Sequence, residues 1–161
     1  MIRIDIPATS ANLGSGFDSL GIALTMCNRV WMEEADELKI TTTDKIKVPT
    51  DETNLIYWAA RHLYQICGKT LPGLHIIQEN NIPMARGLGS SSACIVAGIL
   101  GANRMLGSPM SQSDLINLAA QIEGHPDNTS PAISGGLVAS AMEGKRVYSV
   151  SVPVSGKISF C

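Results

Sequence analysis

The sequence is poor in charge, in aromatic side chains and in long apolar runs. Of its 161 residues, 16% are charged and 4% aromatic, while 45% are hydrophobic and the mean hydropathy is +0.15. This apolar fraction excludes intrinsic disorder, because burial can offset the entropy of the chain, and the length fits one domain with an aliphatic core. The longest apolar run, residues 93–102, is about half of the roughly 20 residues that cross a bilayer. We therefore expect no transmembrane helix and no membrane partner.

The sequence also lacks a basic excess, a cysteine motif and a signal peptide. The net charge is −2 and the pI about 5.9, which argues against nucleic acid as a partner. No two of the four cysteines form a Cys-x-x-Cys pair, so we expect reduced and mostly buried thiols. Asp5 and Pro7 stand where a signal peptide would be apolar, so the expected location is the cytoplasm.

Hydrophobic periodicity predicts a mixture of strands and helices. Period-two alternation or short β-rich runs predict strands at residues 2–6, 20–24, 29–32, 38–42, 45–48, 73–78, 137–141, 146–152 and 158–161, with a turn at 43–44. Helical spacing predicts helices at residues 54–67 and 91–106, and Ser111 with Asp114 resembles a capping box opening a third helix to Glu123. Small and turn-forming residues predict loops at 7–18, 83–89 and 124–136.

The second of these loops has the chemistry of an anion-binding turn. Two glycines and three serines come directly before a predicted helix, in the run Pro83, Met84, Ala85, Arg86, Gly87, Leu88, Gly89, Ser90, Ser91, Ser92 and Ala93. Glycines allow close approach of an anion, and the first N–H groups of a helix are unpaired at its positive end. The Walker A lysine and the third Rossmann glycine are both missing. The alternative is a tight strand-to-helix turn with serine caps and no ligand.

Two further loops are rich in functional groups. Residues 11–18 contain Asn12 and Asp18 among small residues, and an ordinary connection explains them equally well. Residues 123–128 place Glu123, His125 and Asn128 within six positions, and a helix end followed by a Pro-Asp turn is the alternative. A histidine in such a turn is more often structural than a base.

Together the three loops resemble the motifs of the GHMP kinase superfamily, most closely those of its homoserine kinase family. Residues 7–18 are similar to the first motif of that family, residues 83–93 to its ATP loop, and residues 123–128 with 131–133 to its third motif. The resemblance covers the whole chain. It implies an α+β fold, that of a GHMP kinase N-terminal domain, similar to the second domain of ribosomal protein S5, with a mixed sheet packed with helices.

The resemblance implies ATP-dependent phosphorylation of the side-chain hydroxyl of L-homoserine to O-phospho-L-homoserine, in threonine biosynthesis, with Mg²⁺ as the metal. ATP would contact the whole run from Pro83 to Ala93, with Asn54 near the adenine. Ser91 and Glu123 match the Mg²⁺-binding positions and, with Asn128, are the candidate catalytic residues. The candidate substrate-binding residues are Asn12, Asp18, His125 and Asn128. Because Asn128 cannot accept a proton, positioning and charge neutralisation would carry the catalysis, and Asp127 as a base is the less favoured alternative.

Two other functions stay open at this point: a kinase of another small alcohol, such as a mevalonate-like kinase, and a non-catalytic S5-like binding module. Homoserine kinases are about twice as long as this chain and add a C-terminal domain. We therefore expect residues 1–161 to form the N-terminal ATP-binding domain, with no turnover from this length alone. The expected partner is L-homoserine, and a homodimer is compatible with the resemblance.

Overall fold

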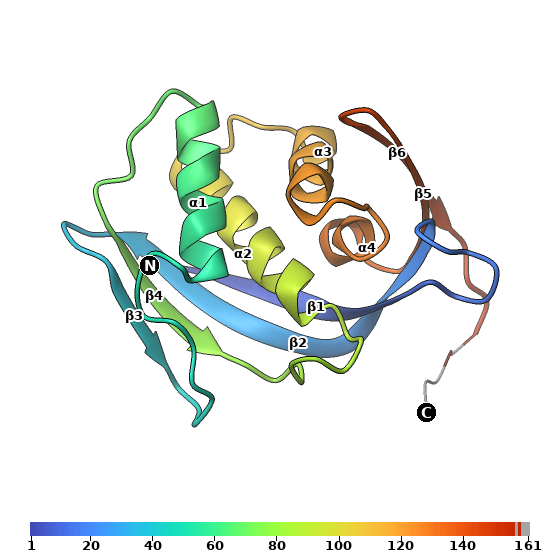
Figure 1. Ribbon diagram of the computed structural model, residues 1–161, viewed down its shortest axis with the longest axis horizontal. Helices are drawn as coiled ribbons and strands as arrows, with labels where there is room; N and C mark the ends of the chain where they lie inside the picture. Colours follow the sequence, from blue (N-terminus) through green and yellow to red (C-terminus); the bar gives the residue numbers. More distant parts are fainter. Residues whose placement is uncertain (157, 159–161) are drawn as a thin grey trace.

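The computed structural model describes residues 1–156 and 158, and in them a sheet carries helices on one side (Figure 1). The strands are β1 (Ile2–Ala11), β2 (Leu20–Glu34), β3 (Lys39–Thr42), β4 (Leu74–Glu79), β5 (Leu137–Glu143) and β6 (Arg146–Val152). The helices are α1 (Leu55–Ile66), α2 (Ser90–Met105), α3 (Gln112–Glu123) and α4 (Thr129–Ser134). The expected α+β fold with a mixed sheet is confirmed.

The long strand β2 organises the sheet. The strand order is β3-β4-β2-β5-β6, and β1 pairs with β2 outside this path. The C-terminal half of β2 pairs with β4 and its N-terminal end with β5, both antiparallel, whereas β3 and β4 are parallel. One strand therefore connects the two ends of the molecule.

The first two strands are longer than predicted. The strand expected to end at residue 6 continues through Pro7 to Ala11, and the runs at 20–24 and 29–32 are one strand. Proline lacks an N–H donor, but β1 pairs with β2 alone, and an edge strand tolerates this loss. The pairing register shifts between Pro7 and Thr9, where β2 bulges and its period-two pattern is interrupted.

Three other expectations were wrong or fall outside the described residues. Residues 45–48 form no strand, because Asp44 turns the chain there by accepting hydrogen bonds from Ile46 N at 2.7 Å and Asn80 N at 2.6 Å. The expected loop at 124–136 contains the short helix α4, whose third residue is Pro131. Proline is tolerated in the first turn of a helix, because the N–H groups there have no partner within the helix. The strand expected at 158–161 falls almost wholly outside the described residues.

The other helix predictions are confirmed to within one or two residues. The Asn54 side chain caps α1, and Ser111 and Asp114 form the capping box of α3. Helix α2 is buried on most sides against α1 and the sheet. No helix in the described part of the chain is long and apolar enough to span a membrane. The core between helices and sheet is aliphatic, and its most buried members include Ile6, Met32, Leu63, Leu74, Ile76, Val96 and Ile99.

Candidate active site

The Gly-rich turn delivers the chain to the N-terminus of α2. Gly87 and Gly89 adopt left-handed backbone conformations, with φ of +69° and +65°, and Gly89 is the N-cap residue of α2. The α2 N-cap has no side-chain hydrogen bond, and no acidic residue lies in the first turn. The amide groups and the positive dipole end of this helix are therefore available to an anion.

Thr9 of β1 holds this turn in place. Thr9 N donates to Leu88 O at 3.2 Å, and Thr9 Oγ1 donates to Asn128 Oδ1 at 2.8 Å. A Cβ added at Gly89 would lie 2.1 Å from Thr9 Oγ1 and 3.1 Å from Asn128 Oδ1. The beginnings of α2 and α4 therefore meet at β1, although Thr9 and Asn128 are 119 positions apart in the sequence.

The end of α3 reaches the same helix N-terminus. Ser92 Oγ donates to Glu123 Oε1 at 2.9 Å, and Ser92 is buried. Ser91 is exposed and lines a cavity beside the turn. The carboxylate of Glu123 is thus fixed at the positive end of α2, next to the predicted phosphate position.

Asp127 is buried inside the third loop. Its exposed fraction is 1%, and its Oδ1 lies 2.5 Å from His125 Nδ1 and accepts from Asn128 Nδ2 at 3.3 Å. The other oxygen, Oδ2, has no hydrogen-bond partner among the described residues. A carboxylate in this position orients His125 and Asn128, and its burial argues against direct contact with a substrate.

Asn12 and Asp18 stabilise the first loop. Both have left-handed backbone, with φ of +57° and +53°, a conformation that Asn and Asp tolerate better than most residues. Asn12 Oδ1 accepts from Asp18 N at 2.8 Å and so closes the loop, and both residues are exposed. Within the described residues, no hydrogen bond joins either side chain to the Gly-rich turn.

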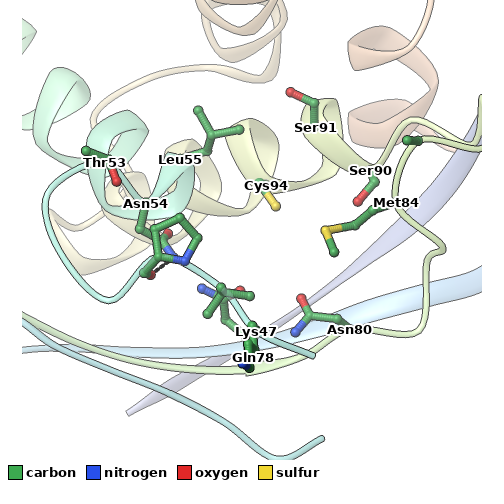
Figure 2. A pocket seen from close by; sticks show the side chains of 13 residues that line it. Lys47, Thr53, Asn54, Leu55, Gln78, Asn80, Met84, Ser90, Ser91 and Cys94 are labelled. Atoms are coloured by element: carbon green, nitrogen blue, oxygen red, sulfur yellow. Dashed lines mark hydrogen bonds between the residues drawn. The ribbon is translucent and has the colours of Figure 1, made fainter. Parts of the chain in front are cut away.

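A cavity of about 300 Å³ lies beside the Gly-rich turn, and Figure 2 shows the side chains that line it. Ser90, Ser91 and Met84 lie on one side of it and Asn54 and Leu55 on another (Figure 2). Its lining comprises Lys47, Val48, Pro49, Thr53, Asn54, Leu55, Gln78, Asn80, Met84, Ala85, Ser90, Ser91 and Cys94. The size is in the range of small-molecule sites.

The cavity wall is mostly uncharged. Burial, together with the nearby Glu123 carboxylate, raises the pKa of the Cys94 thiol to about 11, so the thiol is protonated at neutral pH. Among the described lining residues, Lys47 carries the only charge. Asn54 lines the cavity while its amide is occupied: Oδ1 accepts from Ile56 N at 3.0 Å, and Nδ2 donates to Pro49 O at 2.9 Å. The site thus combines a mostly uncharged cavity with a helix N-terminus whose amide groups are available to an anion.

Several residues of this site did not stand out in the sequence. Thr9 lies in a segment read as a loop, and Lys47, Gln78 and Asn80 lie in or after short β-like runs with no motif. The third loop gave Asn128, but its hydrogen bond to Thr9 depends on tertiary contact. The one local signal was the polar Gln78 within the otherwise apolar pattern of buried positions in β4.

Comparison with known proteins identifies a matching protein family and related enzymes. The family model "GHMP kinases N terminal domain" matches residues 54–136. A homoserine kinase of Clostridium botulinum (strain 657 / Type Ba4) is 45% identical over 163 residues, covering 100% of this chain and 54% of that protein. The crystal structure of homoserine kinase from Cytophaga hutchinsonii ATCC 33406 has a TM-score of 0.82 and 31% identity, covering 96% of this chain and 52% of that chain.

More distant structures share the fold alone. The mevalonate kinase of Methanococcus jannaschii has a TM-score of 0.71 at 15% identity, covering 95% of this chain and 56% of that chain. The present chain spans about half the length of the curated relatives it matches. These relatives therefore extend well beyond the matched region.

Proposed function

Because the chain belongs to the GHMP kinases, we propose that it is the nucleotide-binding part of a homoserine kinase, which transfers the γ-phosphoryl group of ATP to the side-chain hydroxyl of L-homoserine. The products are ADP and O-phospho-L-homoserine, the latter an intermediate of threonine biosynthesis. We also propose the cytoplasm as the location of the reaction. The observation that carries the proposal is the Gly-rich turn at the α2 N-terminus beside an apolar cavity of about 300 Å³.

The two parts of the site suit the two parts of a nucleotide. The cavity offers apolar contacts to a nucleoside, and the amide groups at the start of α2 suit its phosphates. Ser90 and Ser91 lie at the boundary between them. ATP would therefore extend from the cavity to the helix N-terminus.

The oxygen donors at the turn fit Mg²⁺. This cation is commonly held by one or two carboxylates together with the phosphates of its substrate. Glu123 supplies one carboxylate fixed at the α2 N-terminus, and Ser91 supplies an exposed hydroxyl at the same turn. When bound, Mg²⁺ would neutralise phosphate charge.

The homoserine side of the site rests on the first and third loops. We propose that Asp18 binds the amino group of homoserine and that Asn12, His125 and Asn128 bind its remaining polar atoms. Asn128 Oδ1 accepts a hydrogen bond from Thr9 Oγ1, and Nδ2 donates one hydrogen to Asp127 Oδ1, so the second hydrogen of Nδ2 is the one left to donate to a substrate. An amide donor in this place positions an acceptor hydroxyl without removing its proton, which a loose phosphoryl-transfer transition state permits.

Calorimetry with Mg·ATP tests the nucleotide site. Ser91→Ala and Glu123→Gln should each weaken Mg·ATP binding about 10-fold or more, because each loses an interaction with a charged group. Two control variants change the same residue types at exposed positions: Ser149→Ala on β6 and Glu143→Gln on β5. Both should bind like the wild type. Equal affinity in all five proteins would contradict the assignment.

An ADP-release assay on the intact protein tests the substrate. L-homoserine should be phosphorylated faster than mevalonate or galactose, and Asp18→Asn should raise KM for homoserine more than KM for ATP. A dominant rate with mevalonate would assign the protein to another branch of the superfamily.

A further inference from the structure

Gln78 is a buried polar residue in an apolar layer. It lies near the C-terminal end of β4 and is 2% exposed. It shares the buried face of the strand with Leu74 and Ile76, both of which are fully buried. Its Nε2 group has no hydrogen-bond partner among the residues that the structure describes. Buried polar groups are nearly always hydrogen-bonded, so an unpaired donor here requires an explanation.

Gln78 belongs to the wall of the cavity, and its Nε2 atom is covered by protein in the unliganded structure. Gln78 lines it together with Val48, Pro49 and Leu55, which offer apolar contact but no side-chain acceptor. In Figure 2, Gln78 and Lys47 lie low in the view, whereas Ser91 lies high, on the same side as Ser90 and Met84 of the Gly-rich turn. A ligand that pairs with Gln78 therefore does so with a part remote from its phosphates.

We propose that the Gln78 amide turns toward the cavity when a nucleotide binds and contacts the nucleobase, with its Nε2 group donating a hydrogen bond to an acceptor nitrogen or oxygen on the edge of the base. This inference rests on the proposed function, because it takes the cavity as the nucleoside compartment. A nucleobase suits the site chemically: it is flat and uncharged, it tolerates apolar walls on its faces, and its edge carries the acceptors that a glutamine amide pairs with.

A purely structural role for Gln78 makes the opposite prediction for stability. If the amide were needed to hold the fold, replacing it by an apolar side chain would destabilise the unliganded protein. If instead Nε2 is hydrogen-bonded only when a ligand is bound, an apolar side chain in place of Gln78 removes an unsatisfied buried group and stabilises the unliganded protein. The two roles therefore differ in the sign of one measurable change.

The experiment compares Gln78→Met with the wild type in the intact protein. Met matches Gln in length and lacks the donor, and Gln65→Met, at an exposed position of α1, is the matched control. Three quantities are measured: the melting temperature without ligand, the Kd of Mg·ATP, and the Kd of Mg·tripolyphosphate, which has phosphates but no base. Gln78→Leu repeats the set with a second apolar side chain.

We expect the melting temperature of Gln78→Met to rise, its Kd for Mg·ATP to increase about three- to tenfold, and its Kd for Mg·tripolyphosphate to stay at the wild-type value. Wild-type affinity for Mg·ATP, or an equal loss for both ligands, would overturn the inference while leaving the proposed nucleotide site intact. A lower melting temperature in both apolar variants would assign Gln78 a structural role. Failure of the wild type to bind Mg·ATP would overturn the proposed function, and this inference with it.

Discussion

Two glycines of the same turn offer a matched test of how the Gly-rich segment is held against β1. Gly87 and Gly89 both have left-handed backbone, with φ of +69° and +65°. A Cβ added at Gly87 meets nothing within 4 Å, whereas one at Gly89 would lie 2.1 Å from Thr9 Oγ1 and 3.1 Å from Asn128 Oδ1. Alanine should therefore cause similar backbone strain at both positions and a steric clash at only one.

The expected magnitudes separate these two effects. A left-handed conformation costs alanine about 1 to 2 kcal/mol, and overpacking adds about 1 to 3 kcal/mol. We expect Gly87→Ala to lower the free energy of unfolding by about 1 to 2 kcal/mol and Gly89→Ala by about 2 to 5 kcal/mol. Urea unfolding of the intact protein, followed by tryptophan fluorescence, measures both, and calorimetry should show the larger loss of Mg·ATP affinity for Gly89→Ala.

A second substitution tests whether Thr9 is the source of the clash. Thr9→Ala removes Oγ1 and leaves the Thr9 Cβ at 3.4 Å from the added methyl group. Thr9→Ala alone should destabilise the protein, because Asn128 loses its hydrogen bond. In the Gly89→Ala background it should restore part of the lost stability, which a double-mutant cycle detects. Equal destabilisation by Gly87→Ala and Gly89→Ala, or additive effects in the cycle, would refute this account.

Three further predictions address other parts of the molecule. Iodoacetamide should label Cys94 more slowly than free cysteine at pH 8, and faster as the pH approaches the raised pKa of about 11, because alkylation needs the thiolate. Mass spectrometry measures the labelling rate, and a rate at pH 8 like that of free cysteine would contradict the prediction. Ser111→Ala should lower the melting temperature more at pH 7 than at pH 2. The hydrogen bonds from Ser111 lower the pKa of Asp114 below 3.8, and their contribution to stability is lost as acid protonates that carboxylate. Equal effects at both pH values would argue against the capping box. The isolated 161-residue chain should bind Mg·ATP yet show no homoserine-dependent ADP release, since its relatives are about twice as long; release abolished by Ser91→Ala would contradict this.

Local features of the fold were predictable because their signals are local. Asn54 and Ser111 stand directly before helical apolar spacing, and both prove to be N-caps. The Gly-rich run marked the turn that leads into α2 for the same reason, since backbone freedom and helix initiation depend on neighbouring residues. Here propensity and tertiary structure agree.

Features that depend on distant pairing were not predictable. Pro7 indicated the end of a strand, but the edge position of β1, which allows a proline, is set by the absence of a second partner strand along the described chain. Residues 45–48 have β-like composition, yet Asp44 accepts a hydrogen bond from Asn80 N, 36 positions away, and the chain turns toward the cavity. Tertiary contacts override propensity in both cases.

The three consecutive serines show how far the sequence could lead and where geometry was needed. All three were predicted to face phosphates, but successive residues of a helix point about 100° apart and cannot share one environment. Ser92 is buried and donates to Glu123 Oε1, whereas Ser90 and Ser91 line the cavity. This division gives the residues different tasks in the proposed site: Ser92 orients the carboxylate from α3, and Ser91 keeps its hydroxyl free at the turn. Glu123 uses only one oxygen in the bond to Ser92, so the other can face a cation bound with the phosphates, which is why we assign Mg²⁺ to Glu123 and Ser91 together.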